Sequence, residues 1–77
     1  MGFKKSLKKL LSQPTEMRLS EVKVVLAGYG YKWIRNHGSH YIFTKKNHGT
    51  IIIPVHKKKV AKRYLQIIRK RLNISTS

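Results

Sequence analysis

The chain has 77 residues, and 18 Lys and Arg against 2 acidic residues give it a formal net charge of +16 at pH 7. A chain of this length forms one small domain with a single core, and so high a positive charge is rarely kept without a polyanionic partner, of which nucleic acid is the usual one. Cysteine and aspartate are absent, which excludes disulfides, thiolate metal sites and the carboxylate clusters with which Mg²⁺-dependent nucleases hold their ions.

Residues 1–16 are expected to be a basic extension ahead of a domain at residues 17–77. Apolar side chains recur at helical spacing from Phe3 to Leu11 among lysines, until Pro14 interrupts the pattern. Such a pattern is typical of a basic amphipathic helix. We favour the interpretation that this segment is a solvated tail, which adds non-specific attraction to RNA, over the alternative that it is a helix that binds a membrane or a partner.

The domain is predicted to begin with a short helix over residues 20–27. Its apolar side chains recur from Leu19 to Tyr29 at i, i+3, i+7 and i+10, which places them on one helical stripe. Gly28 is placed to end this helix, and Gly30 releases the chain into extended structure.

Three strand-like runs follow, at residues 31–36, 40–45 and 50–55, all rich in aromatic or β-branched residues. The short connections between them each contain a glycine suited to a hairpin turn, so we expect an antiparallel meander. Pro54 cannot donate a ladder hydrogen bond, which places the third strand at an edge or ends it there.

A second helix is predicted after Lys57, reaching about Leu72. One face of it is expected to be buried, with the residues Ala61, Tyr64, Leu65, Ile68 and Leu72. The opposite face is expected to be basic, with Lys59, Lys62, Arg63, Arg69 and Lys70.

The predicted fold is therefore α+β, in the order α-β-β-β-α, with two helices on one face of a three-stranded antiparallel sheet. This is the arrangement of the double-stranded-RNA-binding domain, although a fold alone does not assign an activity. The aromatic residues have two possible roles, stacking on bases or filling the core, and a domain this small is expected to bury Trp33 and Phe43.

The chemistry is expected at the first hairpin, where His37, Gly38, Ser39 and His40 follow one another. Gly38 lets the backbone come close to a ligand, and Ser39 can donate to a phosphate oxygen. His40 opens the next strand, and an imidazole can exchange a proton near neutral pH. From chemistry alone, each histidine is more often a phosphate donor or surface residue than a catalyst, and a metal pair of His37 and His40 has no third ligand nearby in sequence. We therefore expect no metal and no cofactor.

RNA cleavage needs only a base, an acid and cations, because the 2′-hydroxyl of RNA is itself the nucleophile. His40 is our base or acid, and His37 or His56 is the complementary group. The cations that we expect to bind RNA and stabilise charge are Arg35, Lys57, Lys58, Lys59, Lys62 and Arg63.

In the stretch from Met17 to Ile74 these features occur in the order found in the HicA family of bacterial toxins, also called YcfA-like. A short helix ends in Gly30-Tyr31, a strand leads through residues 35–37 into Gly-Ser-His at residues 38–40, and residues 51–56 precede a basic helix. The chain thus resembles this family. The resemblance implies the double-stranded-RNA-binding type of fold, cleavage of messenger RNA by His40, and a HicB antitoxin as partner.

A non-catalytic RNA-binding module is the competing function, since the charge and the fold would suit it without a catalytic histidine. A packing protein of the ribosome or nucleoid would explain the charge but not the hairpin motif. For each of these functions we expect a cytoplasmic protein. The longest apolar run, at residues 51–55, is far below the roughly 20 residues that cross a bilayer, and no signal-peptide core follows the N-terminal lysines.

Overall fold

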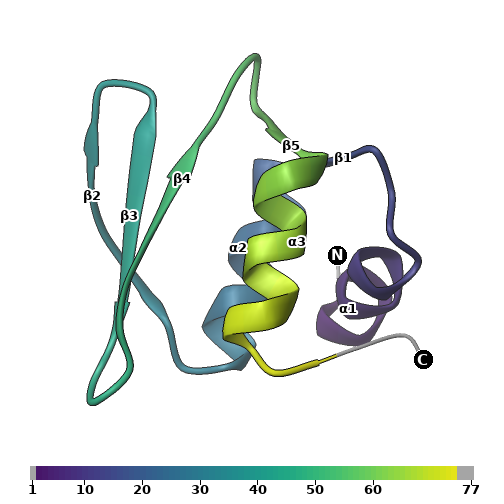
Figure 1. Cartoon of the computed structure of the whole chain (residues 1–77), viewed down its shortest axis with the longest axis horizontal. Helices are drawn as coiled ribbons and strands as arrows, with labels where there is room; N and C mark the ends of the chain where they lie inside the picture. The colour runs from purple at the N-terminus through teal and green to yellow at the C-terminus, as the bar shows by residue number, and fades with distance from the viewer. Residues whose placement is uncertain (1, 75–77) are drawn as a thin grey trace.

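The structure, a computed structural model, describes residues 2–74. Its elements, in chain order, are α1 (Phe3–Leu11), β1 (Glu16–Arg18), α2 (Leu19–Gly28), β2 (Lys32–His37), β3 (His40–Lys45), β4 (Gly49–Pro54), β5 (Lys59–Ala61) and α3 (Lys62–Arg71). Helices α2 and α3 lie together against one face of the β2-β3-β4 sheet, and α1 lies on the side of these helices away from the sheet (Figure 1). Among the described residues, no helix is long and apolar enough to span a membrane.

The three longer strands form the predicted antiparallel meander, in the order β2-β3-β4. Alternate side chains point to opposite faces, and the core of the sheet is on the face toward the helices, where Phe43 is 1% exposed, Ile51 2% and Ile53 1%. Strand β4 lies at the sheet edge and ends at Pro54, as predicted. The α+β class and the order of α2, the three-stranded β2-β3-β4 meander and α3 are thus confirmed, with the short strand β5 added between β4 and α3.

A second, two-stranded sheet was not predicted. Strand β1 pairs with β5 in antiparallel register, and Met17 lies opposite Val60, both fully buried. Each of these strands runs directly into a helix, β1 into α2 and β5 into α3, so the pair fixes the two helices beside one another at their N-terminal ends (Figure 1). Strands of three residues are too short to leave an alternating pattern in a sequence.

Because of this second sheet, the last helix begins later in the chain than predicted. The chain turns at Lys57 and Lys58, continues as β5, and enters α3 only at Lys62. Ala61, expected in the buried stripe of the helix, is exposed, because it precedes the helix and lies on the outer side of β5. Lys59 likewise belongs to the strand and not to the helix.

Residues 3–11 are a packed helix and not the solvated tail that we favoured. Leu10 is 1% exposed and belongs to the same core as the other helices. The Phe3 ring lies on Gly28, where an added Cβ would stand 2.1 Å from the ring, so this glycine permits the close approach as well as ending α2. The sequence showed the amphipathic stripe of α1, but nothing in it identified the surface that the stripe covers.

Arg69, predicted on the exposed basic face of the last helix, is buried instead. Its Nη1 donates a hydrogen bond of 3.0 Å to the carbonyl of Leu10, a main-chain acceptor at the end of α1. The carbonyls at the end of a helix lack their usual partner within it. The Leu10 carbonyl accepts from the Gln13 amide at 3.2 Å, and the buried arginine supplies a second, charged donor. Arg69 is buried because α1 packs over it, and without that helix it would face solvent.

Candidate functional site

The hairpin of β2 and β3 has a loop of only two residues, Gly38 and Ser39, with His37 and His40 paired directly across it. Gly38 has φ +64°, and an added Cβ would meet nothing within 4 Å, so glycine is there for its backbone conformation and not for space. The Val55 amide donates to the Ser39 carbonyl at 2.8 Å. This hydrogen bond joins the loop to the residue that follows β4, and it therefore restrains the position of the main chain next to His40.

His40 points to the face of the sheet that the helices leave open. Since Phe43 faces the helices, the alternation along β3 puts His40 and Ile42 on the other face. A shallow hollow on that face is lined by Arg35, His37, His40, Ile42 and Ile52. The two histidines are exposed to solvent there.

A β-bulge brings Arg35 into this hollow. The register between β2 and β3 shifts between Trp33, which lies opposite Phe43, and Arg35, which lies opposite Ile42. Without the extra residue Arg35 would pair with Tyr41 and point toward the helices. Bulges re-aim side chains in this way and are frequent beside functional sites.

The predicted lysines lie elsewhere. Lys57, Lys58 and Lys59 line a groove on the helix side of the sheet, together with Arg18 and Lys23 and with the apolar and polar residues Leu19, Ser20 and Tyr41. Lys62 and Arg63 are exposed at the start of α3 and line neither this groove nor the hollow of His40. The structure therefore separates the predicted cations into three groups: Arg35 beside His40, the three lysines in the groove, and Lys62 and Arg63 at the start of α3.

His56 is also separated from His40. It forms a β-bridge with Lys59 and lines a third hollow, with Thr15 and Glu16, beside the small β1-β5 sheet. Of the two histidines considered as a partner for His40, the structure brings only His37 into the same hollow.

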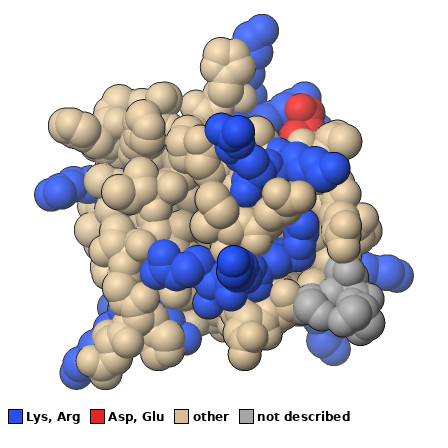
Figure 2. Space-filling model, in the orientation of Figure 1, with Lys and Arg blue, Asp and Glu red and all other residues tan. Residues whose placement is uncertain are grey.

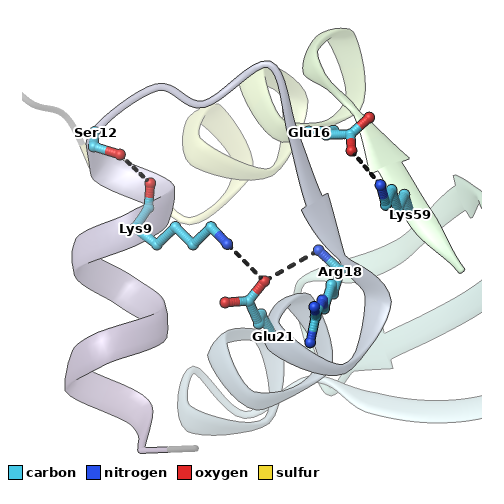
Figure 3. Close-up of polar contacts among 6 residues, drawn as sticks. All are labelled: Lys9, Ser12, Glu16, Arg18, Glu21 and Lys59. Atoms are coloured by element: carbon cyan, nitrogen blue, oxygen red, sulfur yellow. Dashed lines mark hydrogen bonds and ion pairs between the residues drawn. The ribbon is translucent and has the colours of Figure 1, made fainter.

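Both glutamate side chains are engaged in ion pairs (Figure 3). Glu16 contacts the Lys59 ammonium at 2.8 Å, and Glu21 accepts from the Lys9 ammonium and from the Arg18 amide, both at 3.2 Å. Neither lines the hollow of His40. Within residues 2–74, no group of three His, Cys, Asp or Glu is placed to hold a metal ion.

The charged side chains of the surface are nearly all positive, since 18 Lys and Arg stand against 2 acidic residues. Figure 2 shows Lys and Arg side chains spread over the face that α3 presents, while the sheet side at the left carries few. A surface of this kind attracts polyanions over long distances.

The sequence profile of a family described as "HicA toxin of bacterial toxin-antitoxin" matches residues 19–74. The match begins with α2 and includes the β2-β3 hairpin and all of α3. The chain belongs to the HicA toxin family. No curated protein and no solved structure matches it. As a HicA-family protein it is the toxin of a toxin-antitoxin system, and α1 lies ahead of the matched segment.

This HicA-family toxin has an exposed aromatic pair, Trp33 and Tyr41, which the sequence did not predict. Trp33, predicted in the core, is 49% exposed, and its ring stacks on Tyr41 with centroids 5.9 Å apart. The Lys23 ammonium lies 3.9 Å from the Trp33 ring centroid. Strand β2 is an edge strand whose residues all remain exposed, and only knowledge of the strand order could have shown this.

Proposed function

We propose that this HicA-family toxin is an endoribonuclease that cleaves messenger RNA in the cytoplasm, with His40 as its catalytic residue and without a metal ion. The observation that carries the proposal is the hollow in which His40, His37 and Arg35 lie together on an open face of the sheet. The toxin domain of this proposal is residues 17–77, which resembles the double-stranded-RNA-binding fold, and residues 1–16 add α1 to it.

Two imidazoles and a guanidinium supply what cleavage of RNA requires. Side chains directly opposite on neighbouring strands have Cβ atoms about 4.5–5.5 Å apart, so His37 and His40 can reach the two oxygens of one phosphodiester. One imidazole accepts the proton of the 2′-hydroxyl, whose oxygen attacks phosphorus. The other donates a proton to the departing 5′-oxygen, which leaves a 2′,3′-cyclic phosphate and a 5′-hydroxyl.

Arg35 is the group that stabilises the charge that develops on the phosphate oxygens. A guanidinium presents N–H donors in a planar fork that matches phosphate oxygens, and it stays charged throughout the reaction. Gly38 and Ser39 hold the hairpin, and we assign the loop to contact with the RNA backbone. Lys62 and Arg63 at the start of α3 add electrostatic attraction at the end of the molecule where the β2-β3 loop lies (Figure 1).

The antitoxin of this system is, in our proposal, a HicB-like protein that covers the hollow. Ile52 is 55% exposed there and Ile42 is half-buried, beside Arg35 and the histidines. A partner with an apolar centre and an acidic rim would fit this surface, and opposite charge would speed its association with a +16 chain.

The second candidate, a non-catalytic RNA-binding module, is favoured by the separate groove of lysines on the helix side of the sheet. That groove needs no catalytic histidine to bind RNA. The two functions differ in one outcome, which is whether the RNA is cut.

The His37→Ala and His56→Ala variants test the proposal. We expect the wild-type toxin to cut messenger RNA in EDTA, and His37→Ala to cut it at least about tenfold more slowly, because one proton-transfer group is lost. His56→Ala is the matched control and is expected to keep the wild-type rate. Single-turnover rates on one purified transcript give both values. Equal rates for the two variants would remove His37 from the mechanism.

A further inference from the structure

The groove on the helix side of the sheet is cationic and has an aromatic edge. Five of its lining residues are Lys or Arg, and none is acidic; the cations are Arg18, Lys23, Lys57, Lys58 and Lys59. Tyr41 lines the groove, and Trp33 stacks on Tyr41 beside it. Cations for phosphates and aromatic faces for bases therefore meet at one place.

The lysines at the rim of this groove occupy a turn that does not suit them. His56 and Lys59 exchange main-chain hydrogen bonds of 3.0 and 2.9 Å across a two-residue loop, in which Lys57 has φ +52° and Lys58 has φ +64°. Two positive φ values define a type I′ turn, for which Asn-Gly is the preferred sequence. Lysine is less stable than asparagine or glycine at positive φ, so the two lysines destabilise this turn. Their side chains are exposed and place two ammonium groups at the groove.

The turn is also held against a helix. The Leu19 amide, at the start of α2, donates to the Lys58 carbonyl at 2.9 Å. The positions from which the two lysines project are thus set by the main chain of the neighbouring helix. A phosphate bound between the turn and Arg18 would meet a preformed cationic rim.

The Trp33 ring at the edge of the groove is oriented by a hydrogen bond and is half exposed. The Trp33 indole Nε1 donates to the Asn36 Oδ1 at 2.7 Å, which fixes the orientation of the ring. About half of the Trp33 side chain remains exposed, with the Lys23 ammonium over the ring. An exposed and oriented indole is the kind of surface on which an unpaired base stacks.

We propose that this groove is a second RNA site, which binds single-stranded RNA through base stacking on Trp33 and Tyr41 and phosphate contacts to Lys57 and Lys58. Duplex RNA does not fit the aromatic part of this site, because its bases are already stacked inside the helix. His40 and Tyr41 are neighbours on β3 with side chains on opposite faces of the sheet. We therefore assign the groove to nucleotides that flank the cleaved bond. This role rests on the proposed function, but the binding of single-stranded RNA to the groove does not depend on cleavage.

Trp33 is the sole tryptophan of the chain, so its fluorescence reports on the site directly. The experiment titrates the His40→Ala protein with a 2′-O-methyl single-stranded oligonucleotide, which cannot be cleaved, and with the corresponding duplex. We expect the single strand to quench Trp33 and the duplex to leave it unchanged. Quenching by both, or by neither, would overturn the proposal.

Two variants separate the contributions of charge and stacking, with binding measured by the anisotropy of a labelled oligonucleotide. K57N/K58G in the His40→Ala protein introduces the Asn-Gly sequence that a type I′ turn prefers and removes two cations. It should lower the slope of log affinity against log salt by about 1.4, which is the value for two phosphate contacts on a single strand. Trp33→Leu should weaken binding roughly tenfold or more through the lost stacking, with the salt slope unchanged.

The matched control is K4Q/K5Q, which removes the same charge from exposed positions on α1. If it lowers the salt slope as much as K57N/K58G does, the lysine turn has no specific role and the proposal fails. Thermal melts show that each variant is folded, and K57N/K58G should melt no lower than its parent. Cleavage of RNA without quenching of Trp33 would refute this site alone, and quenching without cleavage by the wild type would refute the nuclease alone.

Discussion

Replacing His40 by alanine is expected to slow RNA cleavage in EDTA by about 10²- to 10⁴-fold, the usual contribution of a positioned acid or base. His40 is the first residue of β3 and is exposed in the hollow with His37 and Arg35. No buried contact is lost when its ring is removed, so the melting temperature should stay close to that of the wild type. The effect would therefore be on chemistry and not on folding.

The control for this experiment is His48→Ala. His48 is exposed in the turn between β3 and β4, where its Nδ1 lies 3.0 Å from the Lys46 carbonyl. Its loss removes an imidazole and no part of the hollow, so the rate should not change. A His40→Ala protein that cut RNA as fast as the His48→Ala protein would leave only the RNA-binding function.

Leu10→Ala is expected to reduce the free energy of unfolding by about 2–5 kcal/mol, the range for a buried leucine. Leu10 is 1% exposed, and its carbonyl accepts the hydrogen bond from Arg69. A domain of this kind is stable by about 5–15 kcal/mol in all, so the loss would be a large share. Urea denaturation followed by circular dichroism measures it.

Lys5→Ala on the same helix is the matched control, because Lys5 is exposed and alanine favours helix. We expect its unfolding free energy to stay within about 0.5 kcal/mol of the wild-type value. If Leu10→Ala were equally neutral, α1 would be a solvated tail in solution, and the buried position of Arg69 would lose its explanation.

The sequence was sufficient to predict the elements whose pattern is local. The apolar stripe of α2 and the three strands with their glycine turns are repeated signals of period 3.6 and 2, and the structure has them where expected. Pairing between segments far apart in the chain was not predictable in this way. The partner of Met17 is Val60 and that of Leu10 is Arg69, and both pairings depend on the finished fold.

The candidate site shows the same division. The hairpin that carries Gly-Ser-His could be located from the sequence, because a short connection with a glycine between two strand-like runs indicates a hairpin turn. The structure shortens the turn to Gly38 and Ser39 and places His37 in β2. The place of Arg35 beside His40 depends on one bulge in β2, and the exposure of Trp33 depends on β2 being an edge strand. Neither feature has a sequence signal of its own, so the groove with its aromatic edge could only be recognised in the structure.

The central claim, that the 2′-hydroxyl of the RNA is the nucleophile and His40 moves a proton for it, is tested most directly by one substrate. An oligoribonucleotide with a single 2′-deoxy residue at the cut position should resist the wild-type toxin in EDTA, while the all-ribose strand is cut to a 2′,3′-cyclic phosphate. Cleavage of the deoxy-substituted strand at that position would contradict the claim.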